Sequence, residues 1–345
     1  MDIQRQKFPN VHWIWHGGTS FAYEVHPRIV VKVPKSGEIE KVQFKKELEI
    51  YKTFSENPPC PFIVQCFHFS DKGIFLEYMR DNSLYYRMQQ NHILDPKTRV
   101  VTKVEKLEPL RLRKEWMNDL AHAVAFLESL GLAHGDIRPE NILLDRDRLK
   151  LSDFDCTAKF GSRHEACMGP YGRFLNETEP EEGRQGTAGH LGARTEQFAL
   201  GSVYYYINYG FEVYGDRYLT EDPYDHGPKT MELLMNMVFP ELNGSHGSPE
   251  IDDIIDKCWH NRYAKISELA VEAMEFLNKE TSVGSNGEEE KTEVENISGD
   301  EFEGFSSKKE FCQDLENRGL LDLLCSGEPQ DIGFKFEWYR HILPR

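Results

Sequence analysis

The first part of the chain alternates apolar and polar positions in the way that β-strands do. Within residues 11–34, the segments VHWIWHGG, FAYEVHP and RIVVKVP are rich in β-branched and aromatic residues, and turn residues separate them. Residues 38–54 change to helical spacing, and residues 62–70 and 73–79 form another strand pair across Asp-Lys-Gly. We therefore predict a small antiparallel sheet with one helix.

Helical spacing dominates the middle of the chain. In residues 116–130 the apolar side chains recur at Trp116, Leu120, Val124 and Leu127. Further helices are predicted at residues 231–239, 251–259 and 266–277. Strands followed by a run of helices indicate an α+β protein.

The composition narrows the class of protein. The 345 residues, 39% of them hydrophobic, suffice for one two-lobed domain or two medium ones. No apolar run is long enough to span a membrane, and the first residues lack the core of a signal peptide. Seven scattered cysteines without a C-x-x-C pair are typical of free thiols, so we expect a cytoplasmic or nuclear protein. The net charge of −17 argues against nucleic acid as a partner.

Charge and aromatic content change near the C-terminus. Residues 280–303 hold nine acidic side chains and one lysine, so we predict a disordered linker over residues 279–306. Beyond it, residues 308–325 have helical spacing, and GFKFEWYRHI is too aromatic to remain in solvent. We expect residues 307–345 to dock on the larger, helical lobe.

Polar residues with a meaningful spacing lie in the stretch HGDIRPENILLDRDRLKLSDFD, residues 134–155. Asp136 follows an apolar helix, Asn141 comes five positions later, and two short strands lead to Asp153. This strand–turn–strand path can return Asp153 to the other two. Carboxylate and amide oxygens are hard ligands, which suit Mg²⁺ and the phosphates that it bridges.

Together HGDIRPEN, DFD and EQFALGS resemble the motifs of the eukaryotic protein kinase family, and most closely those of short divergent fungal members. The resemblance covers roughly residues 11–278 and implies a bilobal fold. The N-lobe, residues 1–79, would be a small antiparallel sheet with one helix, and the C-lobe, residues 80–278, would be mainly α-helical. ATP and Mg²⁺ are the implied cofactors.

The resemblance also assigns roles to the polar residues of the stretch. Asp136 would orient the acceptor hydroxyl and take its proton, and Asn141 and Asp153 would bind Mg²⁺. Arg138 stands where Ser/Thr kinases keep a lysine for the γ-phosphate. Glu196 replaces the aspartate that anchors the catalytic loop in kinases.

Lys32 is the expected phosphate-binding residue of the N-lobe. A lysine between valines on a strand is costly to bury without a partner. Kinases pair it with a glutamate of the next helix. We predict Glu47 as that partner, with Glu49 as the second choice.

The other nucleotide contacts follow from the resemblance alone. Gly17 and Gly18 would cover the phosphates, although Thr19 and Ala22 replace the later glycines of the loop. Three residues would line the adenine site: Leu76, Glu77 and Met79. Leu76 would be the gatekeeper, and the backbone groups of Glu77 and Met79 would form hydrogen bonds with the adenine.

We predict an ATP-dependent protein kinase that phosphorylates Ser/Thr in a protein substrate. Gly135 precedes Asp136, where kinases that are switched by phosphorylation keep an arginine, so we predict no control through the activation segment. Arg163, His164 and Arg173 lie in that segment, but nothing in their spacing directs them to the catalytic loop.

Two alternatives remain open. Aminoglycoside and choline kinases share the fold and an H-G-D motif, so the substrate could be a small molecule. A pseudokinase scaffold that binds nucleotide is favoured by the eroded glycine loop, by DFD in place of D-F-G and by the missing A-P-E triplet.

Overall fold

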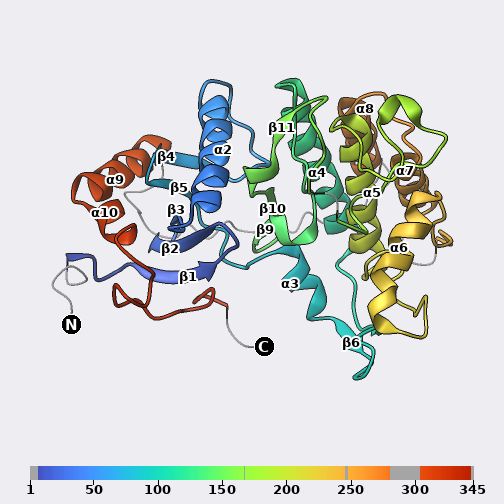
Figure 1. Ribbon diagram of the computed structural model, residues 1–345, viewed down its shortest axis with the longest axis horizontal. Helices are drawn as coiled ribbons and strands as arrows, with labels where there is room; N and C mark the ends of the chain where they lie inside the picture. Colours follow the sequence, from blue (N-terminus) through green and yellow to red (C-terminus); the bar gives the residue numbers. More distant parts are fainter. Residues whose placement is uncertain (1–6, 167, 245–247, 280–303, 343–345) are drawn as a thin grey trace, which may run out of the picture. The chain divides into compact units, whose positions relative to one another are not determined.

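The computed structural model describes residues 7–166, 168–244, 248–279 and 304–342. The described chain divides into two compact units, which we name by their main content (Figure 1). The sheet unit is made by described residues within 1–59, 64–80 and 280–345, and the helical unit by 60–63 and 81–279. An antiparallel sheet followed by a helical region confirms the predicted α+β class.

Five strands form the sheet, in the order β1-β2-β3-β5-β4, and all neighbours are antiparallel. Their bounds are β1 (His12–His16), β2 (Ser20–His26), β3 (Ile29–Pro34), β4 (Cys66–Ser70) and β5 (Gly73–Glu77). The helix α2 (Glu38–Ser55) connects β3 to the β4–β5 hairpin. All five strands lie within the segments that the alternating pattern predicted.

The register of the strands separates two faces, because paired residues on neighbouring strands point to the same side. One face, here the lysine face, carries Ala22, Glu24, Val30, Lys32, Ile74 and Leu76. The other, the aromatic face, carries Phe21, Tyr23, Val31, Val33 and Phe75. Both faces are largely apolar, so both need cover.

The C-terminal extension, residues 304–342, supplies the cover of the aromatic face. It contains two helices, α9 (Phe305–Asn317) and α10 (Leu320–Leu324), which lie beside the sheet in Figure 1. All four leucines of α10 are buried in the same hydrophobic core as Tyr23, whose ring lies 5.2 Å from that of Phe334.

The expectation that the extension docks on the large, helical lobe is therefore wrong. The sequence showed that the aromatic residues of the extension need an apolar surface to pack on. That surface is the aromatic face of the sheet, which the spacing of residues did not identify as exposed to the extension. The segment 308–325, predicted as a single helix, belongs to two helices, because the left-handed conformation of Gly319 interrupts the helix. Most of the predicted linker, residues 280–303, lies outside the described residues.

Six helices of at least five residues are described in the helical unit. Their bounds are α3 (Leu84–Gln89), α4 (Leu110–Ser129), α5 (Ala193–Tyr209), α6 (His226–Met235), α7 (Pro249–Trp259) and α8 (Ile266–Asn278). Side chains are buried around the whole circumference of α5, which is typical of a helix at the centre of a core. α5 packs against α7 and α4, and α4 packs against α8.

Short strand pairs complete the helical unit. Their bounds are β6 (His92–Leu94) with β7 (Val101–Val104), β8 (Leu132–Ala133) with β11 (Ala158–Lys159), and β9 (Ile142–Asp145) with β10 (Arg148–Leu151). The β6–β7 hairpin was not predicted, because strands this short leave too little alternation to detect. α4 begins at Leu110, earlier than expected, directly after Pro109.

Two polar contacts fix α4 in the helical unit. The indole N–H of Trp116 donates to the Asp147 carbonyl, 2.8 Å away, in the turn between β9 and β10. The Glu128 carboxylate accepts the free amides of Ile266 and Ser267 at the start of α8. α4 thereby holds the hairpin that leads to the polar residues of the stretch 134–155. None of the described helices is long and apolar enough to cross a membrane.

Leu321 tests whether the extension stabilises the sheet unit. It is 1% exposed, so Leu321→Ala should lower the free energy of unfolding by about 2–5 kcal/mol. Phe305→Ala, at a position that is 52% exposed, is the matched control and should cost much less. Urea unfolding of the two variants measures the difference. Equal stability of both variants would contradict a structural role for α10.

Candidate active site

Lys32 and Glu47 form an ion pair in the sheet unit. Lys32 lies in the middle of β3, and its ammonium Nζ is 2.6 Å from Oε2 of Glu47 on α2. The Glu47 side chain is 1% exposed and the Lys32 side chain 14%. Glu49, the second candidate, is exposed and lies beside Lys52 instead. The buried Glu47 carboxylate thus orients the ammonium group of Lys32 on the lysine face.

The turn between β1 and β2 holds the two predicted phosphate-covering glycines. The Gly17 amide donates to the Ser20 carbonyl across the turn, 2.9 Å away. A Cβ at Gly17 would meet that carbonyl oxygen at 3.2 Å, whereas a Cβ at Gly18 would meet no atom within 4 Å. The turn is therefore tight at Gly17 and open at Gly18.

The predicted adenine-contacting residues lie at the end of β5. Leu76 is buried on the lysine face, where it pairs with Val30 of β3. The Glu77 amide donates to the Gln65 carbonyl, 2.8 Å away, so this amide is not a donor to a base. Met79 is buried directly after Tyr78, whose amide donates to Arg28.

The β9–β10 hairpin brings together the polar residues on either side of it. Ile142 pairs with Leu151, so Asn141 and Ser152 lie opposite each other, and both the amide and the hydroxyl of Ser152 donate to the Asn141 carbonyl. Asp153 follows in the left-handed conformation with φ 63°, which aspartate tolerates better than most residues. The strand–turn–strand path thus returns Asp153 to Asn141, as predicted.

Asp136 lies in the same cluster. The Asn141 amide nitrogen donates to the Asp136 carbonyl and to its Oδ2, both 2.9 Å away. With its nitrogen turned to Asp136, Asn141 has its amide oxygen left for a cation. Buried His134 accepts the Asp136 amide at Nδ1 and donates from Nε2 to the Ser152 carbonyl. Burial lowers the pKa of His134, so the ring is neutral. Its two hydrogen bonds connect Asp136 to Ser152.

The electrostatic setting of Asp136 suits a general base. Burial raises the pKa of its carboxyl above the ordinary value, and the nearby Asp153 carboxylate acts in the same direction, against Arg138 and the Asn141 hydrogen bond. A raised pKa makes the carboxylate a better proton acceptor near neutral pH. Arg138 itself donates to Glu140 and contacts the sulfur of Met168.

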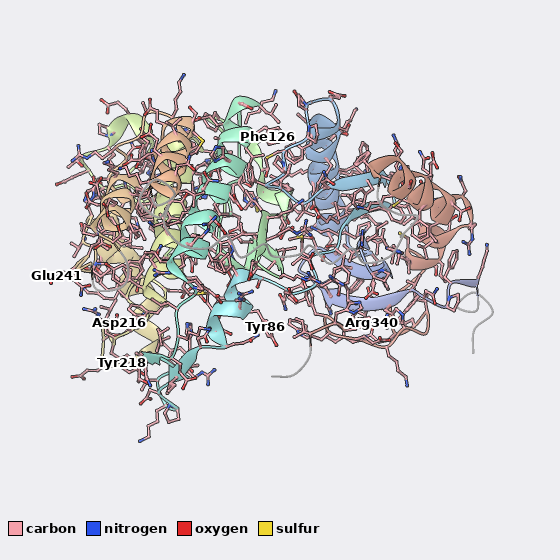
Figure 2. All side chains as sticks on the ribbon, turned by 180° about the vertical axis from the view of Figure 1, so that it is seen from behind. Tyr86, Phe126, Asp216, Tyr218, Glu241 and Arg340 are labelled. Atoms are coloured by element: carbon pink, nitrogen blue, oxygen red, sulfur yellow. The ribbon has the colours of Figure 1, made fainter. Side chains whose placement is uncertain are left out.

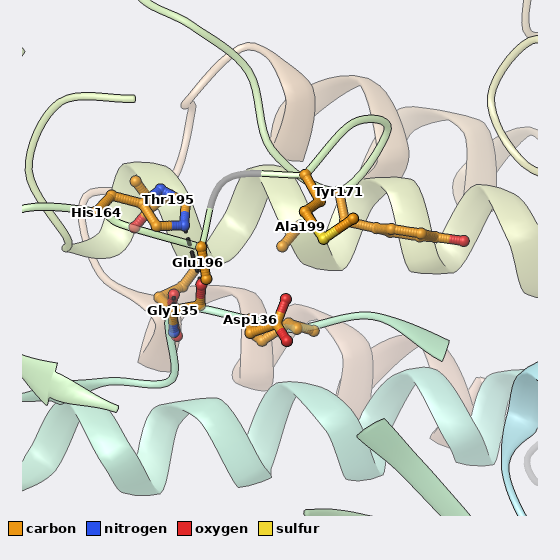
Figure 3. A pocket seen from close by; sticks show the side chains of 10 residues that line it. Gly135, Asp136, His164, Tyr171, Thr195, Glu196 and Ala199 are labelled. Carbon is orange, nitrogen blue, oxygen red and sulfur yellow. Dashed lines mark hydrogen bonds between the residues drawn. The ribbon is translucent and has the colours of Figure 1, made fainter. Parts of the chain in front are cut away.

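Glu196 of α5 anchors the catalytic loop, as predicted. Its Oε2 accepts the His134 amide at 2.6 Å and its Oε1 accepts the Gly135 amide at 3.3 Å (Figure 3). The side chain is fully enclosed, and burial raises its pKa to about 7 against the lowering effect of the two amides. The glutamate therefore makes both bonds that the aspartate of the motif would make.

His164 also reaches the catalytic loop, which the spacing of residues did not indicate. Its Nε2 lies 2.9 Å from the Gly135 carbonyl, and burial lowers the pKa of the ring, so the neutral imidazole donates there (Figure 3). Gly135 has φ +79°, and a Cβ on it would meet the Cys156 carbonyl oxygen at 2.9 Å. An arginine at this position would be strained.

The segment after His164 is fastened by two buried arginines. Arg173 makes a bidentate pair with Glu179, and Arg194 pairs with Glu182 while donating to the Ala188 carbonyl. The sequence contained one signal for these pairs, the run Glu179-Pro180-Glu181-Glu182 in a segment that lacks A-P-E. The spacing along the chain did not identify Arg173 and Arg194 as the partners of these glutamates.

The predicted residues thus form two clusters, one in each unit. In the helical unit Asp136, Arg138, Asn141 and Asp153 meet around the catalytic loop, and in the sheet unit Lys32 and Glu47 meet beside Leu76. The first cluster can hold a divalent cation and accept a proton. The second can hold a phosphate by its lysine.

Comparison with known proteins gives a family for this arrangement. The sequence model described as "Protein kinase domain" matches residues 24–274. CBL-interacting serine/threonine-protein kinase 20 of Arabidopsis thaliana is 23% identical over 276 residues, which are 71% of this chain and 57% of that protein.

Other relatives match over shorter stretches. CBL-interacting protein kinase 2 of Oryza sativa subsp. japonica is 26% identical over 55% of this chain and 39% of that protein. A probable serine/threonine-protein kinase of Dictyostelium discoideum is 26% identical over 40% of this chain and 28% of that protein. The matched stretches cover about half or less of the length of these curated relatives. The kinase-domain match spans most of the chain and includes both clusters, while the turn at Gly17 lies before it. The chain therefore belongs to the protein kinase family.

Proposed function

We propose that this chain is an active, ATP-dependent protein kinase that transfers phosphate to Ser/Thr hydroxyls. The observation that carries the proposal is the bond from the Asn141 amide to the Asp136 carboxylate, directly beside Asp153. It supports a base and a cation site that are already oriented. The Ser/Thr kinases among the relatives support the choice of acceptor.

Each residue has a distinct task in this proposal. Asp136 orients the acceptor hydroxyl and takes its proton, and Lys32, held by Glu47, binds the α- and β-phosphates. Asn141 and Asp153 offer oxygens for Mg²⁺, which when bound neutralises charge on the phosphates. Arg138 binds the γ-phosphate, and Gly17 and Gly18 cover the phosphates. Leu76, Glu77 and Met79 contact the adenine.

The alternatives predict different results. A small-molecule phosphotransferase would favour aminoglycosides, amines or sugars over a protein acceptor. A pseudokinase scaffold would bind nucleotide without turnover that depends on Asp136. The similarity to short fungal kinases, which rests on HGDIRPEN, DFD and EQFALGS, leaves the acceptor protein open.

We also propose that activity does not depend on phosphorylation of the activation segment. The neutral ring of His164 already holds the catalytic loop at Gly135. The amides of Gly161 and His164 donate to the carbonyls of Leu191 and Gly189, which holds the segment by backbone bonds as well. A phosphate would have no arginine at position 135 to bind.

Removing either charged cluster should abolish turnover. We expect Lys32→Ala and Asp153→Ala each to lower phosphate transfer to a generic protein substrate by about 100-fold or more, because positioning and electrostatics supply most of the catalysis. Lys35→Ala, three residues beyond Lys32, is the matched control and should stay near wild type. The measurement is transfer of radiolabelled phosphate from ATP. Near-normal turnover in either variant, once purified and folded, removes that residue from the mechanism.

Stability should depend on pH through Glu196. Its pKa of about 7 in the folded protein lies above the ordinary 4.5, so the folded state binds a proton between these values that the unfolded state does not. This contribution is present below about pH 4.5 and is lost as the pH rises through 7. Melting temperatures at pH 5.5 and 8.0 should therefore differ less for Glu196→Gln than for wild type. Glu181→Gln, at an exposed position, should keep the wild-type difference; identical pH dependence in all three would contradict the assignment.

Phosphatase treatment should leave the activity unchanged. Protein made in bacteria and treated with phosphatase should phosphorylate substrate at the untreated rate, since His164 needs no phosphate. His164→Ala should lower kcat several-fold, while Thr178→Ala, an exposed candidate acceptor, should not. Loss of activity after phosphatase treatment, restored by phosphorylation within residues 156–190, would overturn this proposal.

A further inference from the structure

The last described residues of the chain lie against the edge and the lysine face of the sheet. We call residues 336–342 the terminal segment. Phe336 forms a parallel bridge with Trp13 of β1, and the Glu337 amide donates to the Trp13 carbonyl, 2.8 Å away. The segment thus begins with a single β-bridge to β1, and Figure 1 draws the C-terminal stretch as coil running beside that strand. The contact with β1 continues to Tyr339, whose amide donates to the Ile14 carbonyl at 3.5 Å, while the ring of Trp338 lies 5.1 Å from that of Trp15.

Tyr339 turns onto the lysine face. It is buried in a small cluster with Ile14 and Tyr78, and Ala22, Val30 and Ile342 pack against that cluster. The strand register places Ala22 opposite Lys32, and Val30 opposite Leu76. The tyrosine ring therefore covers the positions that lie beside the phosphate-binding lysine and the adenine-contacting leucine of the proposed function.

An ion-pair cluster holds the same segment to the same face. Glu24, paired with Val30 on the lysine face, is 3% exposed, and its carboxylate lies 3.1 Å from Nε2 of His341 and 3.4 Å from Nη1 of Arg340. Figure 2 labels Arg340 at this segment. A buried carboxylate needs such partners.

Backbone geometry adds an independent sign. Tyr339 has φ 29°, a value that costs a bulky residue steric strain. Strain of this kind is kept where surrounding contacts over-determine it, and it is common in segments that change state. Here the contacts of Tyr339, Arg340 and His341 hold the backbone in this conformation.

We propose that the terminal segment is an autoinhibitory element: it occupies the nucleotide-facing side of the sheet and must leave before ATP binds. The inference rests on the proposed function, in which the lysine face receives ATP. Tyr339 takes the place of the adenine, and the pairs of Glu24 with Arg340 and His341 hold the segment there. Release of residues 339–342 would open the face while the remainder of the extension stays packed on the aromatic face.

Nucleotide affinity of the full-length chain tests the proposal. Tyr339→Ala and the double variant Arg340→Ala/His341→Ala should each bind ATP with Mg²⁺ about tenfold or more tightly than wild type. The reason is that apparent affinity is proportional to the fraction of molecules in which the terminal segment has left the lysine face, and these substitutions should raise that fraction. Phe336→Ala is the matched control: it removes an aromatic residue of the same segment that contacts Trp13 and not the lysine face. Its affinity should equal that of wild type. Isothermal titration calorimetry gives the dissociation constants.

Hydrogen exchange gives a second readout, which separates local opening of the terminal segment from opening of α10. ATP should speed exchange at the amides of residues 339–342 in wild type and leave those of α10 unchanged. Weaker ATP binding by Tyr339→Ala would show that the tyrosine is a wall of the site and would overturn autoinhibition. Unchanged affinity in both variants, with wild-type binding that is lost in Lys32→Ala, would overturn autoinhibition and keep the proposed function. No ATP binding by any protein would overturn both.

Discussion

The buried carboxylate of Glu196 is the contact on which the catalytic cluster depends. It belongs to α5, the most enclosed helix described in the helical unit, so the core itself sets its position. By accepting the amides of His134 and Gly135, it fixes where the loop begins. His134 then accepts the Asp136 amide, and Asn141 donates to the Asp136 carboxylate. This series of hydrogen bonds runs from α5 to Asp136, so the packing of a central helix determines the position of the proposed base.

The sheet unit solves a different problem, because its sheet has two apolar faces. Four leucines of α10 and the ring of Phe334 cover the aromatic face, and ion pairs of Glu316 with His68 and of Asp322 with Lys72 add to these apolar contacts. The lysine face is covered by α2, through Glu47, and by the terminal segment, through Tyr339 and an ion-pair cluster whose basic side chains are each 34% exposed. The two basic side chains are partly exposed and can return to water, whereas the leucines of α10 cannot leave without exposing a buried core. The two ends of one extension therefore differ in how easily they can detach.

The sequence predicted what local pattern and chemistry determine. Alternation gave the five strands, and the cost of burying a lysine pointed to the pair Lys32–Glu47. A hairpin of known length returned Asp153 to Asn141. What it missed depends on contacts between distant residues without a motif. These are the bond of His164 to Gly135, the pairs of Arg173 and Arg194, and the docking of the extension on the sheet. Spacing along the chain carries no information on such contacts when several partners are chemically equivalent.

Gly135 links the geometry of the loop to the way in which the chain can be regulated. Its positive φ, and the Cys156 carbonyl oxygen that a Cβ would meet at 2.9 Å, disfavour the arginine that would bind a phosphate. The activation segment must then be held by groups that carry no switchable charge, and the neutral His164 and the two internal arginine pairs do this. In the proposed function, a segment held in this way is not the control point. Control, if exerted within the chain, then falls to a part that binds by weaker, reversible contacts. The terminal segment on the lysine face has those contacts.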